Sequence, residues 1–145
     1  MISCDTNILF AVCDADVPWH ANAREFLIEH GTNNDFCIAE QVLMELYCLL
    51  RNPTVCKRPL PAAEAARMVH GFRSNRFWRV VDVVSGHGIM DRVWEAAGVD
   101  GFPYRRLFDV RLSRTLRHHG VKEFATRNVK DFHDAGFQKV WDPTS

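Results

Sequence analysis

Met1-Ile2-Ser3-Cys4-Asp5-Thr6-Asn7 opens the chain with a short apolar segment that ends in an acidic residue. A short apolar run closed by polar residues is typical of a buried strand. Three more acids stand beside apolar runs: Glu45 within an apolar helical stretch, Asp109 at the start of another, and Asp131 after a second strand-like run. Because carboxylates are costly to place in apolar surroundings without a partner, these four acids are the candidate functional residues.

Strand-like and helix-like segments alternate along the rest of the chain. Besides Ile2–Cys4, we predict strands at Phe36–Ile38, Trp78–Val84, Glu123–Thr126 and Gln138–Trp141, and helices at Trp19–His30, Glu40–Arg51, Ala62–Arg73, His87–Ala97 and Leu107–His119. Ile8–Val12 is expected to run into a turn, and Arg127–Gly136 to form a loop. The alternation predicts an α/β fold, a three-layer α/β/α arrangement with a central parallel sheet. With 145 residues and no linker, the chain is expected to form a single domain, 1–145.

Composition and cysteine content narrow the class of protein. The chain is 47% hydrophobic and 25% charged, which is ordinary for a globular protein. It has no apolar stretch of membrane-spanning length and no basic leader, so we expect a cytoplasmic protein without a membrane association. The five cysteines lack a CxxC spacing, which favours buried reduced thiols over a disulfide framework or a zinc site.

Charge is unevenly distributed, although the net charge is zero. Residues 1–100 carry 9 Lys and Arg against 13 Asp and Glu, whereas residues 101–145 carry 9 against 5. The basic side chains near Asp109 and Asp131 are Arg105, Arg106, Arg111, Arg114, Arg117, Lys122, Arg127 and Lys130. A basic rim beside an acidic pocket suits a nucleic-acid backbone, and Arg111, Arg114 and Arg127 are the candidates to bind it. A solvated helix face is the alternative interpretation.

The four acids together indicate a metal site. In parallel sheets, sites lie at the carboxyl ends of the strands, where Asp5 and the segment 126–131 both fall. Two like charges about 5 Å apart repel by roughly 3 kcal/mol at an effective dielectric of about 20. A divalent cation removes that cost, and oxygen ligands suit Mg²⁺ or Mn²⁺. Such a site is typical of metal-dependent phosphodiester hydrolysis.

Each acid also has a purely structural interpretation. Asp5 can cap a turn, Glu45 can lie on the exposed face of an amphipathic helix, Asp109 can cap a helix, and Asp131 can pair with a neighbouring Lys or Arg. Glu40 is a rival to Glu45, but five residues place the two about 140° apart around a helix, so only one of them faces the site readily.

The order of these motifs resembles the PIN-domain family, and more closely its VapC-type ribonuclease toxins. The resemblance rests on residues 1–7, Val42–Leu46, Asp109–Gly120, Thr126–Phe132 with Gly136, and Val140–Pro143, and it covers essentially the whole chain. It implies a PIN fold, a Mg²⁺- or Mn²⁺-dependent endoribonuclease acting on RNA such as tRNA or rRNA, a homodimer, and a VapB-type antitoxin partner. It also implies that the antitoxin docks near the helices at 42–50 and 62–72.

The resemblance assigns roles to individual residues. Asp5, Glu45 and Asp109 are expected to hold the metal, Asp131 to complete the catalytic acids, and Asn7, Thr126 and Asn128 to position substrate. Many family members have Asp where this chain has Asn128, so whether Asp131 or Asn128 fills the fourth position stays open, as does the choice between one metal and two. The neutral Asn128 also leaves an alternative: a catalytically weakened PIN-fold module that binds RNA or protein. A dehalogenase-type phosphotransferase is disfavoured because its second Asp is replaced by Asn7.

Overall fold

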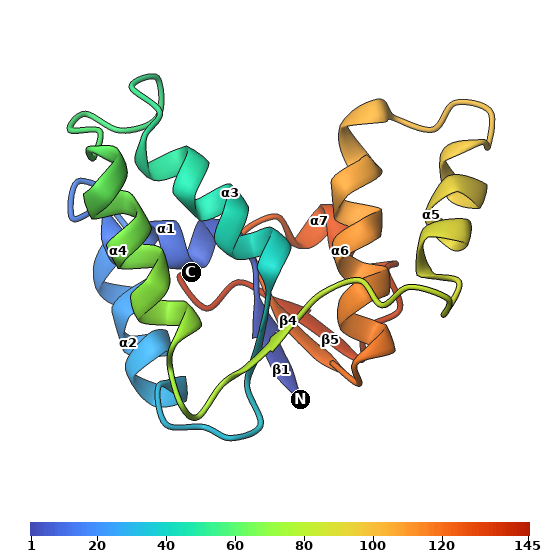
Figure 1. The fold of residues 1–145 in the computed structure, drawn as a ribbon, viewed down its shortest axis with the longest axis horizontal. Coiled ribbons are helices and arrows are strands. Elements are labelled where there is room, and N and C mark those ends of the chain that lie inside the picture. Colours follow the sequence, from blue (N-terminus) through green and yellow to red (C-terminus); the bar gives the residue numbers. More distant parts are fainter.

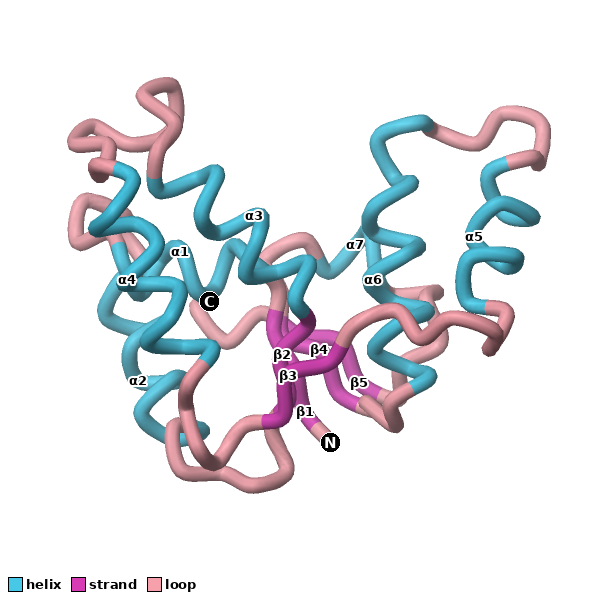
Figure 2. The backbone as a smooth tube through the Cα atoms, in the orientation of Figure 1, coloured by secondary structure: helices cyan, strands magenta, loops and turns pink.

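Five parallel strands form the centre of the computed structural model, which describes residues 1–145. Strands β1 (Ile2–Cys4), β4 (Glu123–Ala125) and β5 (Lys139–Trp141) form one group, and β2 (Cys37–Ala39) pairs with β3 (Arg79–Val81). A parallel bridge between Ile2 and Phe36 joins the two groups, which gives the order β3-β2-β1-β4-β5. The predicted central parallel sheet is confirmed (Figure 2).

Helices cover the sheet on both sides. They are α1 (Thr6–Cys13), α2 (His20–His30), α3 (Glu40–Leu50), α4 (Ala62–Arg73), α5 (Ile89–Ala97), α6 (Leu107–His118) and α7 (Val129–Phe132), with a 3₁₀ turn at Tyr104–Arg106. Figure 1 shows α1 to α4 on one side of the strands and α5 to α7 on the other. The α/β/α layers agree with the prediction. None of the helices combines the length and the apolar character that crossing a membrane requires.

Two short helices replace segments that we expected to be irregular. Residues 6–13 form α1, where the sequence suggested that Ile8–Val12 runs into a turn. The helix begins because Asp5 is extended and its carboxylate accepts a hydrogen bond from the Thr6 backbone N–H, at 2.8 Å. After Asn7 all residues of α1 are apolar, so the sequence lacks the alternation of polar and apolar faces that usually identifies a helix. Likewise α7 lies within the expected loop 127–136.

The core lies between the sheet and both helix layers, and it holds the strand ends in place. Phe124 of β4 is fully buried, and its ring centroid lies 4.8 Å from that of Phe132 in α7. Cys4 and Ala125, the last residues of β1 and β4, are also fully buried and are register partners. All five cysteines are free, as predicted, but only Cys4, Cys37 and Cys56 are buried, whereas Cys13 is partly exposed and Cys48 is exposed. Burial therefore fixes the backbone directly before Asp5.

Gly136 is a point where the backbone demands glycine. Its φ is +92°, and a Cβ there would lie 2.5 Å from the Arg117 guanidinium carbon. We expect Gly136→Ala to lower the free energy of unfolding by about 1–2 kcal/mol, because L-residues are strained in this region. Gly71 of α4 is the matched control, since a Cβ there meets nothing within 4 Å. Gly71→Ala is expected to raise stability by up to about 1 kcal/mol. Urea unfolding of both variants checks the opposite signs, and equal midpoints would contradict them.

Candidate active site

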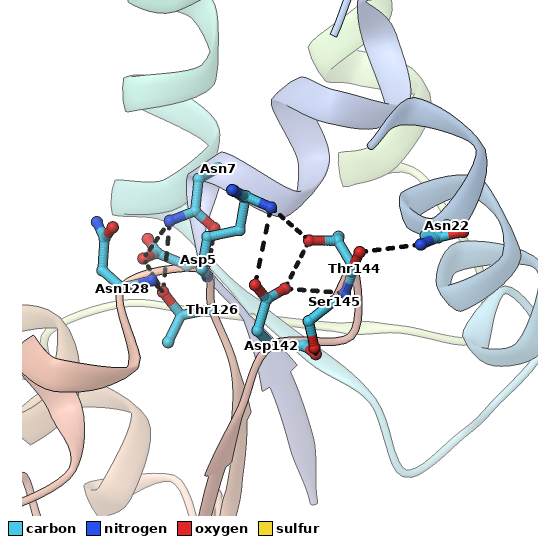
Figure 3. A network of polar contacts seen from close by, with 9 residues as sticks. Asp5, Asn7, Asn22, Thr126, Asn128, Asp142, Thr144 and Ser145 are labelled. Atoms are coloured by element: carbon cyan, nitrogen blue, oxygen red, sulfur yellow. Dashed lines mark hydrogen bonds and ion pairs between the residues drawn. The ribbon is translucent and has the colours of Figure 1, made fainter. Parts of the chain in front are cut away.

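Asp5 lies at the carboxyl end of β1 and is the most enclosed of the four acids. Its side chain is 8% exposed. Besides the Thr6 backbone N–H on Oδ1, its Oδ2 accepts a hydrogen bond from the Thr126 hydroxyl at 2.7 Å and one from the Asn7 amide at 3.2 Å. Three donors therefore hold the carboxylate in one orientation, as Figure 3 shows for Asn7 and Thr126.

Residues following β4 complete this network from the other end of the chain. The Thr126 hydroxyl accepts a hydrogen bond from the Asn128 backbone N–H at 3.0 Å (Figure 3). The Asn7 side-chain oxygen accepts one from the Arg127 backbone N–H at 3.2 Å. The pairing of β1 with β4 brings these segments together, because both strands end at the same edge of the sheet.

Glu45 reaches the site from α3. Its Oε2 accepts a hydrogen bond from the Thr6 hydroxyl at 2.8 Å, and its Oε1 accepts one from the Gln41 amide at 3.0 Å. Glu40, its rival in the sequence, lies elsewhere and forms an ion pair of 2.6 Å with Arg73 of α4. The helix thus directs Glu45, and not Glu40, toward Asp5, as the 140° separation predicts.

Asp109 and Asp131 line a common cavity of about 230 Å³ beside α6. Asp109 occupies the first turn of α6 and is partly buried, whereas Asp131 of α7 is exposed. Arg106 connects the two segments, because its guanidinium donates to the Asp131 backbone carbonyl at 2.6 Å. The fourth acid therefore faces solvent beside Asp109, not the enclosed network of Asp5.

The carboxylates of four different segments influence one another electrostatically. Burial raises the pKa of Asp5 from 3.8 to about 6, and the charges of Glu45 and Asp109 add to that rise, although the hydrogen bonds from Thr126 and Thr6 oppose it. Burial also raises the pKa of Asp109, and the charges of Asp131 and Glu45 raise it further, while Arg106 lowers it. The structure therefore concentrates negative charge at the carboxyl ends of β1 and β2.

The chemistry of the donors fits a hard divalent cation. No group of three or more His, Cys, Asp or Glu side chains lies close enough together to enclose an ion directly. Mg²⁺ does not require such a cage, since it usually keeps several waters and uses one or two carboxylates together with substrate phosphates. Burial, and after it the neighbouring carboxylates, raise the pKa values of Asp5 and Asp109, and a cation would offset both effects.

Comparison with known proteins decides the family. Ribonuclease VapC24 of Mycobacterium tuberculosis is 50% identical to this chain over 143 residues, which are 99% of this chain and 97% of the relative. The chain belongs to the VapC family of PIN-domain proteins. The motifs that carried the resemblance in the sequence therefore identified the family correctly. No family model matches the chain.

Solved VapC structures share the fold of this chain. The crystal structure of Mycobacterium tuberculosis VapC20, described as a sarcin–ricin loop cleaving toxin, superimposes with a TM-score of 0.71 at 20% identity, over 94% of this chain and 96% of that one. The DNA-bound VapBC structure from Salmonella typhimurium gives a TM-score of 0.66 at 17% identity, over 98% and 97%. At these identities the likeness shows the fold alone.

In this VapC chain, two of the three arginines predicted to bind substrate have partners within the protein. Arg111 donates to the Gln41 side-chain oxygen at 2.8 Å and lies 3.5 Å from Asp82. Arg127 donates to the Thr144 hydroxyl at 2.7 Å, and its guanidinium lies 3.5 Å from the centre of the Trp19 ring. The third, Arg114, forms no hydrogen bond or ion pair within the protein and lines the cavity that contains Asp109.

Two residues at the VapC site were missed in the sequence. Gln41 is buried and donates both to Glu45 and to the Phe108 backbone carbonyl, at 2.9 Å, so it ties α3 to the start of α6. Its position four residues before Glu45 is the signal that could have identified it, because such residues share a helix face. Arg106 was noted only as part of the basic rim, and its proximity to Asp109 depends on packing that no local pattern shows.

Proposed function

We propose that this protein is a divalent-metal-dependent endoribonuclease, the toxin of a toxin–antitoxin pair, which hydrolyses RNA phosphodiester bonds. One observation carries the proposal: the buried carboxylate of Asp5, whose pKa is raised to about 6, lies beside Glu45 and Asp109 at the carboxyl ends of the strands. The 50% identical relative is named a ribonuclease, which supports the same activity.

Asp5, Glu45 and Asp109 would hold Mg²⁺ or Mn²⁺ through their oxygens and through waters. When bound, the ion lowers the pKa of a water and polarises the phosphate under attack. The Thr126 and Thr6 hydroxyls fix Asp5 and Glu45, so the carboxylates do not need to reorganise when substrate arrives. A carboxylate at this site would take the proton from the attacking water.

Asp131 suits the fourth catalytic position better than Asn128 does. Its charge contributes to the raised pKa of Asp109, and both acids line the same cavity. Asn128 is neutral, and its contact with the network is through its backbone N–H to Thr126. We therefore assign Asn128, with Asn7 and Thr126, to positioning. An exposed acid beside a cavity can reach a metal-bound water or a second ion.

We propose a VapB-type antitoxin as the protein partner, and its docking surface on α3 and α4. These helices border an open apolar cavity of about 450 Å³, lined by Glu40, Leu43, Met44, Tyr47, Cys48, Ala66, Val69, His70 and Arg73. Met44 is 68% exposed there. An amphipathic segment laid across two helices would bury this surface. The family resemblance also implies a homodimer.

Cleavage of a pool of structured RNAs by the purified protein tests the activity. We expect cleavage with Mg²⁺ or Mn²⁺ and none with EDTA, because the carboxylates repel a phosphate when no cation is present. Metal-independent cleavage would contradict the metal site. Binding of RNA without cleavage in either metal would favour the alternative function, a PIN-fold module that binds RNA.

A further inference from the structure

A second cavity, of about 250 Å³, lies against α5 and α6 and is lined mainly by basic side chains. Its lining residues are His87, Ile89, Arg92, Arg114, Arg117 and His118, and none of them is acidic. Figure 1 places α5 and α6 side by side, on the opposite side of the sheet from α3 and α4. The cavity is therefore separate from the apolar surface proposed for the antitoxin.

Helix periodicity explains why these residues meet. Arg114, Arg117 and His118 stand at positions i, i+3 and i+4 of α6 and thus share one face. Arg92 lies one turn after Ile89 on α5, and His87 precedes that helix. The rings of His87 and His118 approach with centroids 5.0 Å apart. Two elements thus direct the guanidinium and imidazole groups into one hollow.

The charges in this hollow are not neutralised within the protein. The side chains of Arg92 and Arg114 form neither an ion pair nor a hydrogen bond, and the Arg117 guanidinium donates only to the Ala135 backbone carbonyl, at 3.3 Å. By contrast, Arg58, Arg73, Arg106, Arg111 and Arg127 each lie within 4 Å of a carboxylate. Like charges gathered in a concave site repel, and an anion removes that repulsion. Guanidinium groups pair with phosphate oxygens in a planar, bidentate manner.

The basic hollow is continuous with the acidic site. Arg114 and Arg117 also line the cavity that contains Asp109 and Asp131. Along α6, Arg117 follows Asp109 by eight residues, or about 12 Å at 1.5 Å per residue. An anion held between Arg92 and Arg117 therefore lies about two helical turns from Asp109, and it can belong to the same strand as the phosphate under attack.

We propose that the hollow formed by His87, Arg92, Arg114, Arg117 and His118 binds a backbone phosphate of the RNA at a position away from the cleaved bond. This inference rests on the proposed function, because it takes RNA as the substrate. The distant phosphate sets the register of the strand, so that the bond to be cut lies over Asp5 and Asp109. Phosphate contacts carry no sequence information themselves, but they fix where the bases fall.

Arg92→Gln provides the test, because Arg92 is exposed and makes no contact that the fold needs. The control is Arg67→Gln, an exposed arginine of α4 without an ion pair, which removes the same charge elsewhere. Binding of a short fluorescein-labelled single-stranded RNA is measured by anisotropy in EDTA, between about 50 and 200 mM KCl. We expect Arg92→Gln to reduce the slope of the logarithm of the binding constant against the logarithm of the salt concentration by about 0.7. This change corresponds to about a fourfold loss of affinity at about 0.15 M salt. Arg67→Gln should leave both values at those of the wild type.

Equal slopes for Arg92→Gln and Arg67→Gln would overturn the proposal, and so would the absence of any salt-dependent RNA binding by the wild type. Inorganic phosphate, titrated by calorimetry, distinguishes a free anion from a strand. If Arg92→Gln abolishes phosphate binding but leaves the RNA slope unchanged, the site is not one for RNA and the proposal fails. The metal-dependent cleavage assay tests the proposed function separately. If the wild type cleaves RNA but the two variants have equal salt slopes, only the phosphate site is rejected. If Arg92→Gln reduces the slope but the wild type does not cleave, the phosphate site is supported and the nuclease activity is rejected.

Discussion

Replacing Asp5 with Asn is expected to abolish RNA cleavage by this protein. Asp5 is the acid nearest the centre of the site: its carboxylate accepts three hydrogen bonds and lies close enough to Glu45 and Asp109 for their charges to raise its pKa. Neutralising it would remove a charged ligand from the proposed cation, which would stabilise the transition state. Loss of one such contact in an enclosed site costs on the order of 100- to 1,000-fold in rate, and we expect the upper end of that range.

The measurement is the initial rate of RNA cleavage at saturating Mg²⁺ for the wild type, Asp5→Asn and a control. Asp91→Asn serves as the control, because Asp91 is exposed on α5 and forms no ion pair. It should retain the wild-type rate. Circular dichroism is used to check that Asp5→Asn is folded. A folded Asp5→Asn protein with wild-type activity would contradict both the proposed catalytic role of Asp5 and the proposed metal site.

The metal-free protein is expected to lose stability as the pH rises from about 4 to 6, by about 3 kcal/mol on account of Asp5. Its pKa is about 6 in the folded protein and 3.8 ordinarily. Below pH 3.8 the carboxyl is protonated in both states and contributes nothing. Between pH 3.8 and about 6 the folded protein binds the proton more strongly than the unfolded chain does, so the free energy of unfolding falls as the pH rises. Above about pH 6 the loss stays constant. Each unit of pKa difference corresponds to about 1.4 kcal/mol.

Urea unfolding in EDTA at a series of pH values, for the wild type and Asp5→Asn, isolates this contribution. The difference between the free energies of unfolding of the wild type and Asp5→Asn should change by about 3 kcal/mol between about pH 4 and pH 6. The hydrogen bonds lost in Asp5→Asn add a constant to this difference and do not affect its change with pH. Mg²⁺ should stabilise the wild type more at pH 7.5 than at pH 5, since it competes with the proton for Asp5. Parallel stability curves for the two proteins would show that Asp5 ionises as freely in the folded state as in the unfolded chain.

Local signals in the sequence were sufficient for most of the fold. Pro61 precedes α4, and that helix spans Ala62–Arg73 as predicted. Short apolar runs before polar residues located the strands, although the predicted strand Trp78–Val84 is longer than β3, which ends at Val81 before Asp82. Helix α1 was missed because nearly all of its residues are apolar, which hides the helical pattern. The residue that caps it, Asp5, is also typical of a turn. Capping and turn formation use the same side-chain chemistry, so the sequence alone does not separate them.

The residues that meet at the site could be predicted where strand topology brings them together. They could not be predicted where the contact depends on the orientation of individual side chains. Parallel strands end at one edge, so Asp5 and Thr126 were expected to meet, and they do. The partners of Arg111 and Arg127 were not foreseeable, because Gln41 and Thr144 approach them only through tertiary packing. Basic residues near an acid in the sequence look alike, whereas in the folded protein some are neutralised and others, such as Arg114, are not.

The hydrogen bond between Asp5 and Thr126 joins residues 121 positions apart in the chain, and it has a consequence for the synthesis of the protein. A ribosome adds Asp5 long before it adds β4, the strand that fixes the end of β1. A nascent or prematurely terminated chain that stops before Thr126 therefore lacks the partner that holds Asp5 in the candidate site. For a protein proposed to cut RNA, the addition of residues 123–126 thus decides when the candidate site can assemble.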